Sequence, residues 1–507
     1  METAPAAPIR ASDRLHFVLI PLMAQGHMIP IFDIARILGR RRITTTIYTT
    51  PMNATRFRLT MSRNSDLGLP VRLVEVPFAS DEVGLPYGCE NLDALPSPDL
   101  LRKFHCALEK MQAPVEAHLR DQGPPPSCII SDLAVFWTVE IARKFNVPRL
   151  IFNGMSCFSR LVCSNVEEHL RRAPEYYSSL ADSEQFEVPG MPIGFKLRKS
   201  QLPKIFGMLP NLGDFRAKVD EAEKTAQGLI INSFDELEDG CVSLYEKAIG
   251  QRIWCIGPVL MCNKTRVDRL NRGNKVASDE ADRCIEWLDG MGPGTVVYAC
   301  LGSLCRLVPA QLMELGKGLE ASNRPFIWVV KTAENERTWE LEKLLKDYNF
   351  EERTRGRGFL IRGWAPQLAI LSHRSIGAFL THCGWNSTLE GLCSGLPMIT
   401  WPLFAEQFVN EAMVVDVLRV GVRVGVETAV KFGQEAKLGV LVKEGEVLRA
   451  IEEVMSSGEK GEERRKRAVE LAEKGRTAAE EGGGSSYSNL THLIQFIICE
   501  LESRSKM

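Results

Sequence analysis

Residue types that suit a nucleotide gather in one stretch of the chain, from Trp364 to Gln407. The apolar run Ile376–Thr381 predicts a buried strand, and a glycine-softened turn that begins with His382 follows it. Asn386 and Ser387 are good capping residues and predict the start of a helix. A helix N-terminus carries unpaired N–H groups and a partial positive charge, which favour a phosphate. The pattern therefore indicates a phosphate site at the end of a strand.

Other side chains in this stretch match the remaining parts of a sugar nucleotide. Glu390 lies about one turn into the predicted helix, where its carboxylate can accept both hydroxyls of a ribose. Trp364 offers a flat face for a base, although a core aromatic residue is an equally good interpretation of a single tryptophan. Glu406 and Gln407 follow the next predicted strand, Pro397–Trp401, and can hold sugar hydroxyls.

A second chemical pair, His27 and Asp132, comes from distant parts of the chain. Each residue follows a predicted strand, Leu15–Pro21 for the histidine and Ser127–Ser131 for the aspartate. Ligands of open parallel sheets bind beyond the carboxyl ends of the strands, so both residues are expected at the edge of a crevice. A carboxylate that holds an imidazole in one tautomer makes a general base at neutral pH. Spacing alone favours the simpler interpretation that His27 starts a helix and Asp132 is an N-cap.

Several common catalytic motifs are missing from the sequence. No Gly-x-Gly-x-x-Gly follows the first strand of either predicted domain, and no Gly-x-x-x-x-Gly-Lys-Ser/Thr occurs, which argues against dinucleotide and P-loop sites. Ser131 and Ser303 lie outside a Gly-x-Ser-x-Gly elbow, so a serine hydrolase is not supported. Ser303 follows a strand and suits a phosphate ligand or a helix cap. The 8 histidines form no metal-spaced cluster, so we expect no metal site.

The composition is typical of a soluble protein with more than one domain. The 507 residues are too many for a single core, and hydrophobic and charged residues make up 45% and 25% of the chain. A net charge of −2 gives no broad electrostatic case for nucleic acid or an anionic membrane. The 14 cysteines contain no Cys-x-x-Cys pair, which argues for reduced thiols, and no apolar run reaches the length of a membrane span. We expect a cytoplasmic protein without a transmembrane segment, and a monomer.

Alternating strands and helices must position these residues. The chain begins with the strand Leu15–Pro21, a helix opened by Pro30 in its first turn, and the strand Ile43–Thr49. A second series of the same kind begins near Cys284, and Val259–Ser278 between the two series is predicted to be a polar linker. Repeated β/α alternation predicts an α/β protein with doubly wound parallel sheets.

The stretch WAPQLAILSHRSIGAFLTHCGWNSTLEGLCSGLPMITWPLFAEQ resembles, over its full length, the secondary-product signature box of plant family-1 UDP-glycosyltransferases. The resemblance covers nearly all 507 residues and implies the GT-B fold, in which two Rossmann-like domains face each other across a cleft. It implies an acceptor-binding domain over residues 1–253, a linker over 254–283 and a UDP-sugar-binding domain over 284–485. Residues 486–507 are then expected to form a helix that packs back on the first domain.

The same resemblance assigns roles to individual residues. His27 matches the catalytic histidine of the family in a Gln-Gly-His turn, and Asp132 matches its partner in a Ser-Asp pair. The resemblance implies that Ala365 pairs with uracil through its backbone and that Trp385 serves the phosphates through its backbone N–H. The residues expected to bind the UDP-sugar are Ser303, Trp364, Ala365, Gln367, His382, Gly384, Trp385, Asn386, Ser387, Glu390, Glu406 and Gln407.

The activity that the resemblance implies is inverting transfer of glucose from UDP-glucose, without a cofactor, to a hydroxyl of a lipophilic plant metabolite such as a flavonoid or a triterpenoid. Gln407 resembles the glucose-using members, and Glu406 stands where many relatives have Asp. The expected acceptor pocket contains Met23, Phe136, Trp137, Asn153 and Phe158. Asn153 stands where relatives often have His, so the polarity of this pocket departs from the family pattern.

Two alternatives remain open. A sugar-nucleotide epimerase shares the fold, but it needs additional acid/base groups near the sugar, which the sequence does not identify. A non-enzymatic binder of a UDP-sugar or a hormone does not need the pair of His27 and Asp132. Release of UDP and formation of a glycoside would separate the transferase from both.

Overall fold

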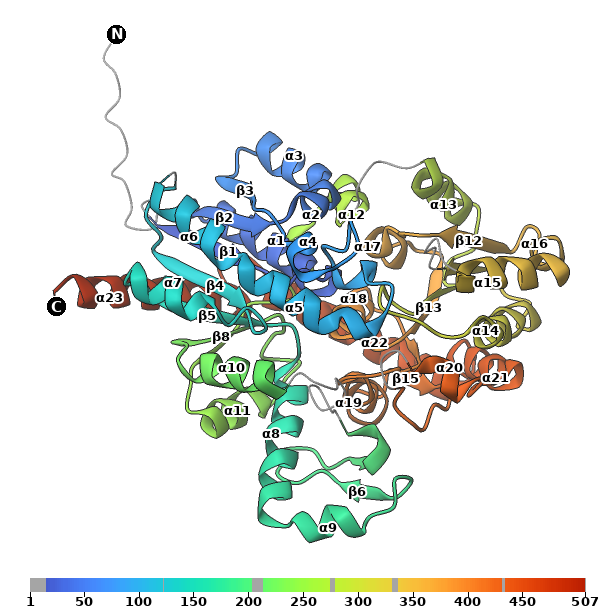
Figure 1. The fold of residues 1–507 in the computed structure, drawn as a ribbon. Coiled ribbons are helices and arrows are strands. Elements are labelled where there is room, and N and C mark those ends of the chain that lie inside the picture. The colour runs from blue at the N-terminus through green and yellow to red at the C-terminus, as the bar shows by residue number, and fades with distance from the viewer. Residues whose placement is uncertain are drawn as a thin grey trace.

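Two parallel β-sheets organise the chain in a computed structural model, which describes residues 15–121, 123–202, 213–273, 279–330, 336–430 and 434–506 (Figure 1). The first sheet, which defines the first domain, consists in spatial order of β3 (Val71–Glu75), β2 (Thr44–Thr49), β1 (His16–Ile20), β4 (Cys128–Asp132), β5 (Arg149–Asn153), β8 (Gly228–Ile231) and β9 (Ile253–Cys255). The second sheet, which defines the second domain, consists of β12 (Gly358–Arg362), β11 (Phe326–Val330), β10 (Val296–Cys300), β13 (Ile376–Thr381), β14 (Met398–Thr400) and β15 (Gly421–Arg423).

Burial on both faces explains the sequences of the central strands. All five residues of β1, HFVLI, are buried, and β13, IGAFLT, is buried at every position except Gly377. Near-continuous apolar runs are typical of parallel strands that helices cover on both sides. The predicted strands Leu15–Pro21 and Ile376–Thr381 are therefore confirmed as β1 and β13.

Both sheets reverse their strand order at a central point. In the first sheet β1 lies between β2 and β4, and in the second sheet β10 lies between β11 and β13. Helices leave the two neighbouring strands toward opposite faces at such a point, which opens a crevice at their carboxyl ends. The two α/β layers, each built in this way, confirm the predicted pair of Rossmann-like domains.

Helix α1 (Gln25–Arg40) begins earlier than the sequence predicted. Pro30 was expected in its first turn, but five residues precede Pro30 inside the helix, and His27 lies in the first turn. Proline has no N–H and leaves the carbonyl of the residue four positions earlier without its helical donor, so an interior proline normally disfavours a helix. That expectation was wrong here because the second domain supplies another donor to this carbonyl, as described below.

The remaining helices cover the sheets and connect the domains. Those of the first domain are α2 (Pro51–Arg56), α3 (Arg58–Asp66), α4 (Ser80–Val83), α5 (Leu101–Lys110), α6 (Gln112–Asp121), α7 (Thr138–Lys144), α8 (Cys157–Arg172), α9 (Pro174–Ser179), α10 (Gly213–Lys224) and α11 (Cys241–Ile249), with a hairpin of β6 (Gln185–Glu187) and β7 (Lys196–Arg198) beside α9. Those that follow are α12 (Arg266–Asn271), α13 (Asp279–Asp289), α14 (Pro309–Ala321), α15 (Glu336–Asp347), α16 (Phe350–Arg353), α17 (Gln367–Leu371), α18 (Trp385–Cys393), α19 (Gln407–Ala412), α20 (Glu435–Leu438), α21 (Glu444–Val454), α22 (Glu459–Ala478) and α23 (Ser485–Ser505).

The C-terminal helix α23 packs on the first sheet. Its apolar side chains Leu490, Leu493, Ile494 and Ile497 lie in the same buried cluster as Phe17 of β1. Figure 1 shows the red helix α23 reaching the left edge of the molecule, where the chain ends, and α23 contacts the strand β9 as well as the helix α22 before it. The end of the chain therefore contributes to the core of the domain in which the chain begins.

The segment between the sheets is structured over its described part. The predicted polar linker Val259–Ser278 contains a 3-10 turn, Val259–Cys262, and helix α12. Thr265 caps α12 by accepting the N–H of Asp268, whose carboxylate in turn accepts the N–H of Thr265. Residues 274–278 of the linker lie outside the described residues.

Candidate active site between the two domains

His27 and Asp132 meet at the reversal point of the first sheet. His27 lies in the first turn of α1, after β1, and Asp132 ends the neighbouring strand β4. The imidazole Nδ1 lies 2.6 Å from Oδ2 of Asp132. The other carboxylate oxygen of Asp132 accepts the N–H of Ala134 at 3.1 Å, so the carboxylate is oriented by the turn that follows its strand. This second bond stabilises a turn and is not the helix N-cap that the simpler interpretation predicted, because the next helix, α7, begins only at Thr138 with Trp137 as its N-cap.

The charge of the Asp132 carboxylate controls the protonation of His27. Burial alone lowers the pKa of His27, but the charge and hydrogen bond of Asp132, with a smaller contribution from Glu406, outweigh it and raise the pKa above its ordinary value. The His27 side chain is 36% exposed, whereas that of Asp132 is 2% exposed. When Nδ1–H donates to Asp132, the lone pair of the neutral ring is on Nε2. The pair can therefore accept a proton from a hydroxyl and stabilise the resulting imidazolium.

The second domain approaches the same helix end. The amide nitrogen of Asn386, in the first turn of α18, donates a hydrogen bond to the backbone carbonyl of Gly26. Glu406, which follows β14, is close enough for its charge to act on His27. Burial raises the pKa of Glu406, and the charge of His27 opposes this shift. The candidate base therefore faces residues of the predicted donor site across the domain interface.

His382 is held between two glycines at the reversal point of the second sheet. A Cβ at Gly302, after β10, or at Gly384, after β13, would overlap the imidazole ring. Burial lowers the pKa of His382 to about 4, so the ring is neutral at pH 7. Its Nδ1 atom is buried and has no hydrogen-bond partner among the described residues. An unpartnered ring nitrogen beside the N-terminus of α18 fits an anionic ligand such as a diphosphate.

Helix α18 begins at Trp385, as the sequence predicted, but its cap differs. The residue before the helix is Gly384, which makes no side-chain cap bond, whereas Asn386 and Ser387 lie inside the first turn. The prediction that they cap the helix was wrong because both side chains have tertiary partners. Asn386 contacts Gly26, and Ser387 accepts a hydrogen bond from Gln367 at 3.1 Å. The indole N–H of Trp385 donates to the carbonyl of Asn232 in the first domain at 2.8 Å. The Trp385 ring is therefore structural, and only its backbone faces the helix N-terminus.

The residues predicted to bind a nucleoside are brought together. Gln367, the first residue of α17, donates from Nε2 to Oε2 of Glu390 at 2.7 Å and accepts from the hydroxyl of Tyr298 at 3.2 Å. Trp364 is 38% exposed just before this helix, and the carbonyl of Ala365 accepts the N–H of Gln367. The structure thus brings the proposed ribose carboxylate, Glu390, into contact with Gln367, which follows the proposed base platform Trp364 by three residues.

The residues predicted to contact the sugar and the phosphates occupy strand ends. Gln407 is buried, and its Oε1 accepts the N–H groups of Leu403 and Phe404, so this oxygen shapes the loop after β14. Ser303 follows Gly302 directly after β10, beside the glycine that contacts His382. Both therefore lie at the carboxyl edge of the second sheet, where the sequence placed them.

The five residues predicted for the acceptor pocket do not form one cluster. Met23 and Trp137 are buried in the core of the first sheet, and Phe158 belongs to a separate buried cluster with Phe195. Phe136 is half-buried and packs edge-on against Phe215. Asn153 ends β5 and accepts the N–H of Met155, and the next residue, Gly154, lies against the His27 ring. Asn153 is thus next in sequence to the residue that contacts the candidate base.

Sequence reasoning missed the buried charges that flank this site. Arg272, in the predicted linker, contacts both Asp33 of α1 and Glu390 of α18. A single arginine in a polar linker carries no local signal of a buried tertiary partner, so no pattern in the sequence indicated it.

Among the described residues, no group of three His, Cys, Asp or Glu side chains is arranged to hold a metal ion, and no helix combines the length and apolarity needed to cross a bilayer.

Comparisons with known proteins show the family to which the chain is similar. The family model "UDP-glucoronosyl and UDP-glucosyl transferase" matches residues 259–446. UDP-glycosyltransferase 73D1 of Arabidopsis thaliana is 50% identical over 97% of this chain and 98% of its own length. The crystal structure of Glycyrrhiza uralensis UGT73P12 complexed with glycyrrhetinic acid 3-O-monoglucuronide superposes with a TM-score of 0.85 and 33% identity over 97% of each chain. Arabidopsis thaliana UGT89C1 complexed with quercetin gives a TM-score of 0.70 and 28% identity over 95% of this chain and 99% of that one.

These similarities span both domains and confirm the resemblance and the fold that the signature stretch indicated. The match to UGT73P12 extends over 97% of the chain, so it includes the segment between the sheets as well as both sheets. A relative of this identity over this length shares the family and its type of reaction. The chain belongs to the plant UDP-glycosyltransferases, which transfer a sugar from a UDP-sugar to a small-molecule acceptor.

Proposed function

We propose that this enzyme transfers glucose from UDP-glucose, with inversion, to a hydroxyl of a lipophilic plant metabolite. The observation that carries the proposal is the 2.6 Å contact between His27 Nδ1 and Asp132, which leaves Nε2 as the proton acceptor at the domain interface. His27 removes the proton of the acceptor hydroxyl, and Asp132 stabilises the imidazolium that forms. The acceptor oxygen attacks the anomeric carbon from the side opposite to UDP, which gives a β-glycoside.

The second domain binds and activates the donor in this proposal. Trp364, Ala365 and Gln367 hold the uracil, Glu390 accepts the ribose hydroxyls, and Glu406 with Gln407 binds the glucose. The leaving diphosphate is stabilised by neutral His382, Ser303, Ser387 and the N–H groups at the start of α18. No cofactor is needed, since the developing charge falls where these donors converge.

The first domain, with residues near the carboxyl ends of β4 and β5, binds the acceptor. The relatives support an aromatic or polycyclic acceptor: the structure of UGT73P12 contains glycyrrhetinic acid 3-O-monoglucuronide, and that of UGT89C1 contains quercetin. A triterpenoid or a flavonoid is therefore the substrate class that we propose. The cytoplasmic location and the monomeric state remain predictions.

The test is incubation of the full-length enzyme with UDP-glucose and a mixed panel of flavonoids, triterpenoids and steroids. UDP release together with products heavier by one hexose supports glucosyl transfer. Conversion of UDP-glucose to another UDP-hexose, without a glycoside, would instead show an epimerase. Tight UDP-glucose binding without any turnover would show a binding protein. UDP-galactose in a parallel reaction tests whether Gln407 selects glucose.

A further inference from the structure

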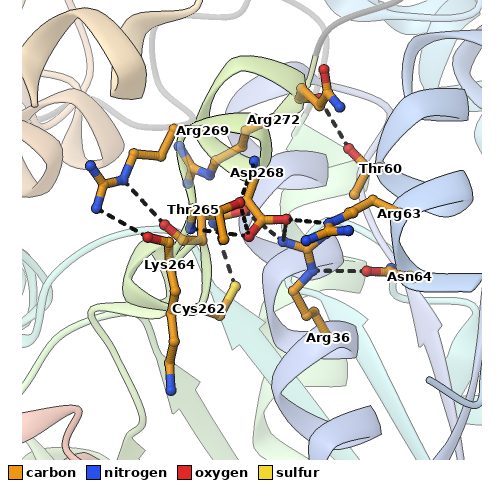
Figure 2. Close-up of polar contacts among 12 residues, drawn as sticks. Arg36, Thr60, Arg63, Asn64, Cys262, Lys264, Thr265, Asp268, Arg269 and Arg272 are labelled. Atoms are coloured by element: carbon orange, nitrogen blue, oxygen red, sulfur yellow. Dashed lines mark hydrogen bonds and ion pairs between the residues drawn. The ribbon is translucent and has the colours of Figure 1, made fainter. Parts of the chain in front are cut away.

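The linker between the domains is fixed to the first domain by a buried polar network, which Figure 2 shows. Asp268 of α12 accepts from Arg63 of α3 at 3.1 Å and forms an ion pair with Arg36 of α1 at 3.3 Å. The hydroxyl of Thr60 donates to the carbonyl of Asn271 at 3.2 Å. Arg36 and Asp268 are buried, so breaking these contacts would leave unpaired charges in the protein interior. Helix α12 is therefore held in place beside α1 and α3.

Arg272 extends from this fixed linker into the second domain. Its Nε donates to Oδ2 of Asp33 at 2.8 Å, and its Nη1 donates to Oε1 of Glu390. The Arg272 side chain is 7% exposed, and both carboxylates are buried as well. Burial alone disfavours the guanidinium charge, but Asp33 and Glu390 outweigh it and raise the pKa of Arg272. One cation thus joins the helix that carries His27 to the helix that carries the proposed ribose ligand.

The Glu390 carboxylate is held at both oxygens and still has capacity to accept hydrogen bonds. Arg272 occupies Oε1, and Gln367 donates to Oε2 at 2.7 Å. An ionised carboxylate has about four acceptor sites, so about two remain for other donors. The two neighbouring hydroxyls of a ribose are spaced so that each can donate a hydrogen bond to one oxygen of the same carboxylate. The two protein contacts therefore orient Glu390 without saturating it.

The residue after Arg272 borders the proposed base platform. Gly273 has φ +69°, and a Cβ there would lie 2.9 Å from Ile29 Cδ1 and 3.0 Å from Trp364 Cζ2. Glycine is required at this position both by the left-handed conformation and by the lack of space. The linker backbone thus passes against the edge of the Trp364 ring and forms one wall of the nucleoside site.

We propose that Arg272 is a positioning residue for donor binding, which fixes the Glu390 carboxylate so that both its oxygens can accept the ribose hydroxyls of the UDP-sugar. This inference rests on the proposed function, because it requires Glu390 to bind the ribose. Arg272 acts through Glu390 and does not itself touch the nucleotide. Because α12 is fixed to the first domain, the two contacts of Arg272 also join α18 to α1, the helix of the candidate base.

The test compares two nucleotides that differ only in the hydroxyls at issue. Binding of UDP and of 2′,3′-dideoxy-UDP is measured by titration calorimetry on the full-length wild type and on Arg272→Lys. A lysine ammonium lacks the planar fork that spans Asp33 and Glu390. We expect Arg272→Lys to weaken UDP binding about tenfold, the effect of one hydrogen bond to a charged group. Binding of dideoxy-UDP, which has no ribose hydroxyls to place, should change by less than about twofold.

Two further variants serve as a control and as a replacement in this comparison. Arg269→Lys is the matched control, because Arg269 lies on α12, which Arg272 follows directly, and among the described residues it donates to the carbonyls of Asn263 and Lys264. It should bind both nucleotides like the wild type. If Arg272→Lys does not fold, as thermal unfolding will show, the charge-balanced double variant Asp33→Asn/Arg272→Gln takes its place, because it removes one cation and one anion together.

The outcomes separate this inference from the proposed function. Equal weakening for both nucleotides would assign Arg272 a general structural role, and unchanged or tighter UDP binding would also overturn the inference. Glu390→Gln is measured in parallel. If it binds both nucleotides like the wild type, the ribose role of Glu390 itself is wrong. If it weakens UDP alone while the Arg272 variants do not, only the role of Arg272 is wrong.

Discussion

Asn386 of the second domain donates a hydrogen bond to the backbone carbonyl of Gly26 in the first domain. In an uninterrupted helix this carbonyl would accept the N–H of residue 30, but Pro30 has none. The proline that should disfavour the helix therefore provides a free acceptor next to His27. A helix irregularity in one domain and a side chain of the other thus join the candidate base to the start of α18.

Pro30→Ala should weaken this connection. The new N–H of residue 30 competes with Asn386 for the Gly26 carbonyl, so we expect kcat to fall about threefold to tenfold, as for the loss of one hydrogen bond, without a lower Tm. Steady-state kinetics and thermal unfolding measure both. Pro309→Ala is the control, because Pro309 is at the start of α14, where no helical N–H is lost. An unchanged kcat would show that the Gly26 contact does not place His27.

His27→Ala should abolish transfer and leave nucleotide binding intact. Loss of a general base costs about a hundredfold to ten-thousandfold in rate, whereas His27 does not contact UDP in our proposal. UDP release measures the first effect and titration calorimetry the second. His373→Ala is the control, since His373 forms a similar pair with Asp289 at 3.1 Å near the amino end of β13. Normal turnover by His27→Ala would contradict the assignment of the base.

Asp132→Asn should move the pH dependence of kcat. The Asp132 charge raises the pKa of His27, and His27 acts as a base only when it is neutral. Removing the charge lowers this pKa, so the acid limb of the profile should shift to lower pH by about one unit or more, with a lower plateau. Glu406→Gln should shift the limb in the same direction by less, because Glu406 is the smaller contribution. An acid limb that stays in place in Asp132→Asn would mean that another group titrates.

The strands and their order could be expected from the sequence because local pattern decides them. Apolar runs such as HFVLI in β1 have few alternatives to a buried parallel strand, and the polar residues that follow them must lie at one sheet edge. Local pattern alone therefore predicts that His27 lies at the same edge as Asp132, and that His382 lies near the start of α18. The motif resemblance then distinguishes a catalytic pair from two capping residues.

What the sequence could not show depends on partners from the other domain. The start of α1 was predicted too late because Asn386 satisfies the carbonyl that Pro30 leaves open. Asn386 and Ser387 were predicted as caps because their tertiary acceptors and donors are not encoded nearby. Arg272 went unnoticed for the same reason, since its two carboxylates come from α1 and α18. Local rules describe what a residue prefers, and long-range contacts decide which preference is satisfied.

Gly384→Ala should weaken UDP binding through His382. Gly384 has φ −60° and ψ 140°, which any residue adopts, so the only cost of a methyl group is its overlap with the imidazole ring. Displacing a donor from an anionic ligand should lower the UDP affinity by about tenfold or more. Titration calorimetry checks this value. Gly445→Ala, in α21 with no atom within 4 Å of an added Cβ, controls for glycine replacement as such. Wild-type affinity in Gly384→Ala would remove His382 from the phosphate site.

Glu238 should make the stability of the fold depend on pH. Burial raises its pKa to about 7, although the N–H groups of Cys157 and Phe158 at the start of α8 donate to it at 3.0 and 2.7 Å. Between about pH 4.5, its unfolded value, and pH 7, the folded protein binds a proton that the unfolded chain does not. The free energy of unfolding then falls as pH rises, by about 1.4 kcal/mol per pH unit.

Glu238→Gln removes this titration but keeps an oxygen that accepts one of the two N–H groups. Urea unfolding at pH 5 and at pH 7 should therefore show the wild type losing about 2 kcal/mol more than Glu238→Gln between the two conditions. Glu236→Gln, an exposed neighbour, controls for the loss of a carboxylate from this loop. If the Glu238→Gln and wild-type stabilities fell in parallel, Glu238 would be ionised in the folded state throughout, and the two helix N–H groups would outweigh its burial.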